Sequence, residues 1–255
     1  LFCLKNIYLT SILLRMIVLG KKKRDRLYIE GGISFRNFLY KSVKFLGMDN
    51  LRLKINVPKY GFQAYCRTED EFNDLVIMTQ HEHDLIKRFS PKKGDVVVDI
   101  GAHAGLYTIT SSKCVGQNGK VIAIEAHPHN FEILHRNIKS NNSTNVMPFN
   151  YIAYSKEMEM VLSVKHLDKI VAVRINTLDN LLQQNGINEV NWMKVDVDEP
   201  ELEVLKGAHN VLSNSKDIAL LIEVHGHNNY KPLTEFLHSY NFTVVFEKSY
   251  EWGVK

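Results

Sequence analysis

Cysteine is scarce in this chain of 255 residues, which has three in all. Cys3, Cys66 and Cys114 are far apart and form no C-x-x-C pair. This argues against a disulfide framework, a zinc finger or an iron–sulfur cluster, and it favours a reducing, cytoplasmic location. The hydrophobic content of 45% and the charged content of 24% exclude wholesale disorder and a collagen-like chain.

A long uncharged apolar run is also missing. The first twenty residues are strongly apolar, but Lys5 and Arg15 interrupt them, whereas a membrane-spanning helix needs ~20 mostly apolar residues. A basic run at 21–24 follows, so peripheral contact with a membrane surface through residues 1–26 stays open, beside a packed helix or a disordered extension. The first methionine is Met16, which leaves open that the numbering begins upstream of the true start. We therefore leave residues 1–30 out of the fold argument.

Positive charge is confined to one end of the chain. Residues 1–60 carry 13 Lys and Arg against 3 Asp and Glu, whereas residues 61–255 carry 19 against 25. The acidic main body disfavours a nucleic-acid partner. We expect an N-terminal extension (1–30), an accessory segment (31–69) and one main domain (70–255), and the oligomeric state stays open.

Apolar strands alternate with helices from residue 95 onward. The segment 96–100, V-V-V-D-I, is rich in β-branched residues and is typical of a strand buried on both faces. Strand–helix alternation predicts an α/β fold with a parallel, doubly wound sheet. We expect a hairpin at 157–175 and a short helix from Thr177. Further strands are expected at 121–125, 145–154, 192–197, 218–224 and 242–248, and helices at 70–89, 104–115, 129–140, 200–212 and 229–239.

Small residues lie where the first of these strands turns into a helix, in the segment D-I-G-A-H-A-G at 99–105. Gly101 has no Cβ, so a cofactor can approach the backbone closely there. The helix that follows presents unpaired N–H groups and the positive end of its dipole, which suit an anionic group. Asp99 would repel a pyrophosphate and attract a sulfonium, which favours S-adenosyl-L-methionine over a nucleotide bound through its phosphates. We expect Ala102, His103 and Gly105 to line the same pocket.

Two nucleotide-binding fingerprints are absent at this turn. His103 stands where the second glycine of G-x-G-x-x-G belongs, and no G-K-[ST] follows. This argues against an NAD-dependent or nucleotide-sugar enzyme, the first rival. Glu125 ends the next strand, where an acidic side chain can accept hydrogen bonds from both hydroxyls of a ribose.

Three motifs in order resemble the FkbM family of class I S-adenosylmethionine-dependent methyltransferases. They are VVVDIGAHAGLYT, IAIEAHPHNFEILHRNI and MKVDVDEPELEVLKGA, within residues 70–247. The resemblance implies a Rossmann-like fold with a seven-stranded mixed sheet. It also implies methylation of a hydroxyl on a saccharide or other small molecule. We expect the adenine near Tyr151–Tyr154, with Ala153 among its contacts.

The third motif departs from the family pattern. Asp198 replaces a Glu, and Glu199-Pro200 replaces a Gly-x pair. The change lies where the acceptor should bind, so the second rival is a non-catalytic S-adenosylmethionine-binding module.

Three residues at the ends of later strands are candidates for the chemistry. Asp196 would orient or deprotonate the acceptor hydroxyl, although capping the next helix is its structural alternative. Glu223 and His225 share one face by the period-two rule, and His225 is a second candidate base. Its structural alternative is a hydrogen bond to a loop carbonyl. Asp196, Asp198, Glu223 and His225 could converge on a metal, but strand-end carboxylates are common and we predict none.

Overall fold

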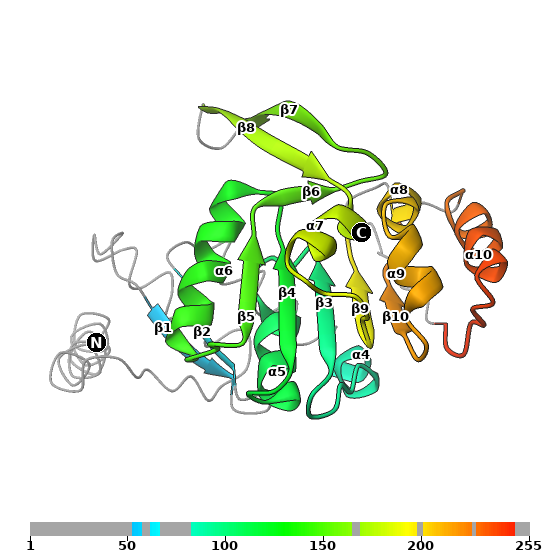
Figure 1. Cartoon of the computed structure of the whole chain (residues 1–255). Coiled ribbons are helices and arrows are strands. Elements are labelled where there is room, and N and C mark those ends of the chain that lie inside the picture. The colour runs from blue at the N-terminus through cyan, green and yellow to red at the C-terminus, as the bar shows by residue number, and fades with distance from the viewer. Residues whose placement is uncertain are drawn as a thin grey trace, which may run out of the picture.

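The computed structural model describes residues 53–57, 62–66, 83–164, 169–197, 201–225 and 228–247 (Figure 1). Membrane contact through residues 1–26 and the altered segment 198–200 lie outside these ranges, and the domain limits at 30 and 69 stay predictions. Within the described ranges, no helix has both the length and the apolar character that crossing a membrane requires.

Five parallel strands form the central sheet, in the order β10-β9-β3-β4-β5. Numbered along the chain within this sheet, the order is 3-2-1-4-5, that of a doubly wound fold, and it confirms the predicted α/β class. The strands are β3 (Val96–Ile100), β4 (Lys120–Ile124), β5 (Val146–Phe149), β9 (Trp192–Val195) and β10 (Ala219–Ile222).

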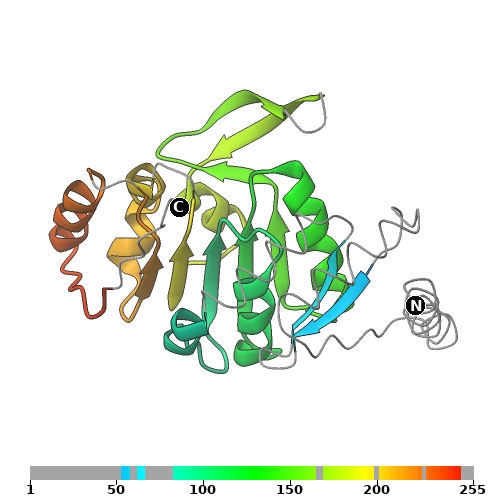
Figure 2. The ribbon, with the colours of Figure 1, turned by 180° about the vertical axis from the view of Figure 1, so that it is seen from behind.

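Helices cover both faces of this sheet (Figures 1 and 2). Alternate residues of a strand point to opposite faces, so Val97 packs in a cluster with α5, whereas Val98 packs with α7 to α10. On the first face lie α4 (His83–Arg88), α5 (Leu106–Val115) and α6 (Pro128–Ser140). On the second face lie α7 (Leu178–Gln184), α8 (Glu201–Lys206), α9 (His209–Asn214) and α10 (Tyr230–Ser239).

Two small sheets lie outside the central one. β1 (Leu53–Val57) and β2 (Phe62–Cys66) are antiparallel, and Asn141 at the end of α6 exchanges hydrogen bonds with the backbone of Gln63. The predicted hairpin is confirmed as β7 (Met158–Val164) and β8 (Lys169–Asn176). It joins β6 (Tyr151–Ala153) in the order β6-β8-β7, and the hairpin stands beyond the carboxyl ends of the central strands (Figure 1).

The prediction of a single helix at 200–212 is wrong in one respect, because this segment divides into α8 and α9. A Cβ at Gly207 would lie 2.0 Å from the carbonyl oxygen of Tyr154. The Asp179 carboxylate then accepts from the N–H groups of Asn210 and Val211, at 2.8 and 3.0 Å. Contacts with β6 and α7 therefore end one helix and begin the next.

The strand predicted at 242–248 does not form over residues 242–247. Its alternating apolar residues are not buried on one face, since Val245 is 93% exposed and Phe246 lies over the guanidinium of Arg88 at 3.8 Å. Among the described residues the central sheet therefore has five parallel strands, not the seven of mixed direction that the resemblance implied.

Candidate active site

The predicted glycine turn joins β3 to α5 and is fastened to the neighbouring strand. The backbone N–H groups of Gly101 and Ala102 both donate to the carbonyl of Ile124, at 2.9 and 3.0 Å. Gly101, His103 and Gly105 have positive φ values of 75°, 48° and 90°. This backbone path favours glycine at two of the three positions and is strained at His103.

Each of the two glycines leaves room for a neighbouring element. A Cβ at Gly101 would lie 1.7 Å from the carbonyl oxygen of Asp196, and one at Gly105 would lie 2.7 Å from Cδ1 of Leu134. The close approach expected at Gly101 is present, but the group that approaches is the backbone carbonyl of Asp196, which follows β9. Gly105 lets α5 pack against α6.

The first turn of α5 can hold an anionic group. Gly105 is the N-cap, no side chain caps the helix, and its first turn contains no acidic residue. The backbone N–H groups at such an end lack helical partners, so they fit the carboxylate of a methionine moiety.

Glu125 follows β4 and faces the glycine turn. It is 6% exposed, and its two carboxylate oxygens accept from the backbone N–H groups of His103 and His127, each at 2.8 Å. Burial raises the pKa of Glu125, and these two hydrogen bonds oppose the rise. Each carboxylate oxygen has a second acceptor position, so the pair of ribose hydroxyls remains a suitable ligand.

A buried cation, Lys194, connects the two halves of the site, which are the expected donor half at the glycine turn and the expected acceptor half at the ends of β9 and β10. The Lys194 ammonium lies 2.9 Å from Oδ2 of Asp196, 3.6 Å from Oδ1 of Asp99 and 3.1 Å from the carbonyl oxygen of Gly101. Asp99 is fully buried and also accepts from the Thr108 hydroxyl at 2.5 Å. Burial raises the pKa of Asp99, against the opposing effect of Lys194.

The position of Asp99 changes what can be expected of it. The Asp99 carboxylate could contact the methyl donor only if the side chain left this buried position. We therefore expect Asp99 to stabilise the glycine turn and not to bind the methyl donor. Ala153, the last residue of β6, is likewise buried and belongs to the core cluster.

A hollow of about 320 Å³ opens beside β6. It is lined by Tyr151, Glu157, Met158, Arg174, Ile175, Asn176 and Gln184.

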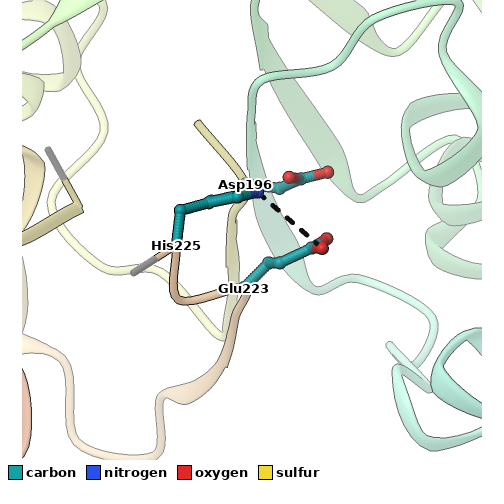
Figure 3. A group of neighbouring side chains, drawn as sticks. All are labelled: Asp196, Glu223 and His225. Carbon is teal, nitrogen blue, oxygen red and sulfur yellow. Dashed lines mark ion pairs between the residues drawn. The ribbon is translucent and has the colours of Figure 1, made fainter. Parts of the chain in front are cut away.

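Asp196, Glu223 and His225 come together as expected (Figure 3). Asp196 follows β9 and Glu223 follows β10; these strands are parallel neighbours, so their carboxyl ends meet. Nε2 of His225 lies 3.8 Å from Oε1 of Glu223, and one ligand atom from each of the three residues lies within 4.8 Å of the others. Lys194 already places a positive charge beside Asp196, which opposes a second cation at these atoms.

Electrostatics separate the two candidate bases. Burial opposes ionisation of Asp196, but Lys194 outweighs it and holds the pKa of this carboxyl below its usual value. Burial lowers the pKa of His225, but the carboxylates of Glu201, Glu223 and Asp196 together raise it above its usual value. A general base works best with a pKa near the working pH, which favours His225.

Two residues of the third motif have contacts that sequence reasoning missed. They are Lys194 and Glu201. In the structure, Lys194 is 5% and Glu201 1% exposed. Charged residues are seldom buried without a partner. The position of Lys194 within a strand and of Glu201 at the start of a helix was the sequence feature that could have indicated buried, paired charges.

The sequence matches the methyltransferase FkbM domain over residues 99–244. The chain belongs to the FkbM methyltransferase family. The match begins at the glycine turn and extends beyond His225, so it covers both halves of the site. The protein is therefore an S-adenosylmethionine-dependent methyltransferase.

Two relatives of this FkbM methyltransferase share about a quarter of its residues over the matched regions. The hexuronic acid methyltransferase AglP of Haloferax volcanii is 27% identical, over 61% of this chain and 67% of that one. The methyltransferase sdnD of Sordaria araneosa is 24% identical, over 60% of this chain and 74% of that one. Among solved structures, a precorrin-6y C5,15-methyltransferase from Geobacter metallireducens has a TM-score of 0.45 at 15% identity, covering 64% of this chain and 71% of that one.

Proposed function

We propose that this FkbM methyltransferase transfers a methyl group to a hydroxyl of a saccharide or another small molecule. The donor would lie against the glycine turn, with its methionine carboxylate at the first turn of α5 and its ribose at Glu125. The acceptor would lie beside Asp196, Glu223 and His225.

One observation supports this arrangement most directly. The glycine turn follows β3, Glu125 follows β4, and the Asp196 and His225 region follows β9 and β10. All four strands are parallel, so the donor and acceptor groups share one edge of the sheet, where open α/β sheets bind ligands. Lys194 contacts both groups and fixes their relative position.

The acceptor hydroxyl is a weak nucleophile and must lose its proton. When bound, the donor supplies a sulfonium methyl, and a C–O bond to the acceptor replaces its C–S bond. The proton of the hydroxyl passes to Nε2 of His225, so the methyl ether product is neutral. Loss of the methyl group turns the sulfonium into a neutral thioether. Asp196 stays ionised beside Lys194 and would accept a hydrogen bond that orients the acceptor.

A saccharide acceptor has independent support. The relative from Haloferax volcanii is named as a hexuronic acid methyltransferase. The side chains of Asp196, His225 and Glu223 are one-third to two-fifths exposed at the strand ends. Their hydrogen-bond acceptors suit the hydroxyl groups of a sugar.

The test is methyl transfer from a labelled donor to a panel of hydroxylated metabolites and saccharides. We expect labelled product from the wild-type protein. His225→Gln should lower turnover by about 10²–10⁴-fold and leave the affinity for S-adenosylhomocysteine unchanged in calorimetry.

Glu189→Gln is the control, because Glu189 is an exposed acid that precedes β9, whereas Asp196 follows the opposite end of this strand. It should retain full turnover. Donor binding without methylation of any acceptor would contradict the proposal and favour the non-catalytic module. Full turnover of His225→Gln would remove His225 from the mechanism.

A further inference from the structure

Glu201 is a carboxylate in an unusual position. It is the first residue of α8, and its side chain is 1% exposed. Moving a carboxylate out of water is unfavourable unless hydrogen bonds compensate for the lost hydration. The hydrogen-bond partner of this carboxylate therefore indicates what its burial achieves.

Both hydrogen bonds described for Glu201 come from one residue. Its Oε1 accepts from the backbone N–H of His225 at 2.8 Å and lies 2.9 Å from Nδ1 of the same residue. The Asn229 side-chain amide also donates to the His225 carbonyl, at 2.6 Å. The backbone and the ring of His225 are thus held from two elements, α8 and the turn before α10.

The geometry also assigns the proton on the ring. Oε1 acts as an acceptor toward the backbone N–H, and an ionised carboxylate has no proton to donate. With Glu201 ionised, Nδ1 carries the hydrogen in its contact with Oε1. In the neutral imidazole, Nε2 is then left with its lone pair, on the side that faces Glu223.

We propose that Glu201 is the positioning residue for His225. It holds the ring with Nδ1–H toward the interior and Nε2 toward the acceptor, so that Nε2 is ready to receive the proton of the hydroxyl. This inference rests on the proposed O-methylation for its purpose, but the tautomer and the ring orientation do not depend on any substrate.

The charges around the ring agree with this role. Among the described residues, Glu201 faces Nδ1, Glu223 faces Nε2, and Asp196 lies beside them with Lys194 behind it. The hydrogen bond to Glu201 is the largest of the effects that raise the pKa of His225, ahead of the charges of Glu223 and Asp196. Removing the charge of Glu201 should therefore lower this pKa more than removing that of Asp196.

The experiment is a nitrogen-15 NMR titration of the histidine rings in the full chain without donor or acceptor. His225→Gln identifies the His225 signals by their loss. We expect the neutral ring to carry its hydrogen on Nδ1 in the wild-type protein. In Glu201→Gln, which keeps the shape of the side chain, the pKa of His225 should fall. An Nε2–H tautomer in the wild-type protein, or an unchanged pKa in Glu201→Gln, would overturn the inference.

Activity gives the second measurement. Glu201→Gln should lower kcat on the order of 10²-fold on the plateau above the acid limb, with KM little changed, and move the acid limb of the pH profile to lower pH. Glu203→Gln is the matched control on the same helix, because Glu203 bonds Ser155 and Lys206 instead. It should leave the profile in place. If Glu201 only stabilised the fold, Glu201→Gln would lower the melting temperature and leave the pH profile in place.

The two hypotheses can fail separately. If the wild-type protein methylates no acceptor but shows the Nδ1–H tautomer, the proposed function fails and the positioning role of Glu201 stands. If methylation is observed and the tautomer is Nε2–H, the enzyme assignment stands and the role of Glu201 is refuted.

Discussion

The two halves of the site are built in different ways. In the proposed donor half, backbone N–H groups and a buried carboxylate, Glu125, would form the binding surface, and they lie within one strand–turn–helix unit and the strand beside it. In the proposed acceptor half, the side chains of Asp196, Glu223 and His225 would form the surface, each about one-third to two-fifths exposed. A fourth side chain, that of Glu201, contacts His225 from a separate helix.

This difference matches what each half must recognise. A backbone surface has little freedom to vary, because it depends on positive φ values and close packing, and it suits a cofactor that never changes. A side-chain surface can change by substitution without altering the fold, and it would suit the acceptor. Substitutions in each half can test this contrast.

Removing the residue that joins the halves should have the largest effect on stability. Lys194→Met would leave Asp99 buried without its nearest cation. We expect a loss of about 3–5 kcal/mol in the free energy of unfolding, measured by urea denaturation. Lys206→Met, which removes an exposed cation paired with Glu203, should cost less than about 1 kcal/mol. Equal losses would show that Lys194 does not join the halves.

Gly101→Ala tests whether packing or backbone strain dictates the donor half. Its Cβ would collide with the Asp196 carbonyl, whereas a Cβ at Gly116, which also has positive φ, meets nothing within 4 Å. Gly116→Ala should cost about 1–3 kcal/mol, because its φ of 66° and ψ of −169° lie in a region that is essentially restricted to glycine, and Gly101→Ala about 1–3 kcal/mol more. Thermal and urea unfolding would measure both. Equal costs would mean that the end of β9 moves aside easily.

Asp179→Ala tests the break between α8 and α9 on the acceptor side. Loss of the two hydrogen bonds to Asn210 and Val211 should cost about 1 kcal/mol, again by denaturation. Asp217→Ala is the control. Asp217 is an exposed acid between α9 and β10, so its replacement should have almost no effect on stability. If Asp179→Ala also proved neutral, Gly207 alone would determine where α8 ends.

The smallest effect concerns charge within the acceptor half. Asp196→Asn removes one of the carboxylates that raise the pKa of His225, so that pKa should fall. The acid limb of the kcat profile should then move to lower pH, by less than in Glu201→Gln. A shift to higher pH, or a larger shift than in Glu201→Gln, would contradict the ordering of the two carboxylates.

Much of the fold could be read from the chain itself. The β-branched run at 96–100 and the glycine turn after it predicted β3 and the start of α5 within a few residues, because short-range periodicity and turn chemistry act locally. The same reasoning failed at 242–248 and at Gly207. There the outcome depends on whether another element buries the strand or ends the helix.

The sequence by itself determined the α/β alternation, the donor turn and the placement of Asp196, Glu223 and His225 at strand ends. The tertiary structure decided which of their neighbours matter. Lys194 meets Gly101 across 93 residues of sequence, and Glu201 meets His225 across 24. Burial of a charge in such a contact follows from the packing of whole elements, so it leaves little trace in local composition or periodicity.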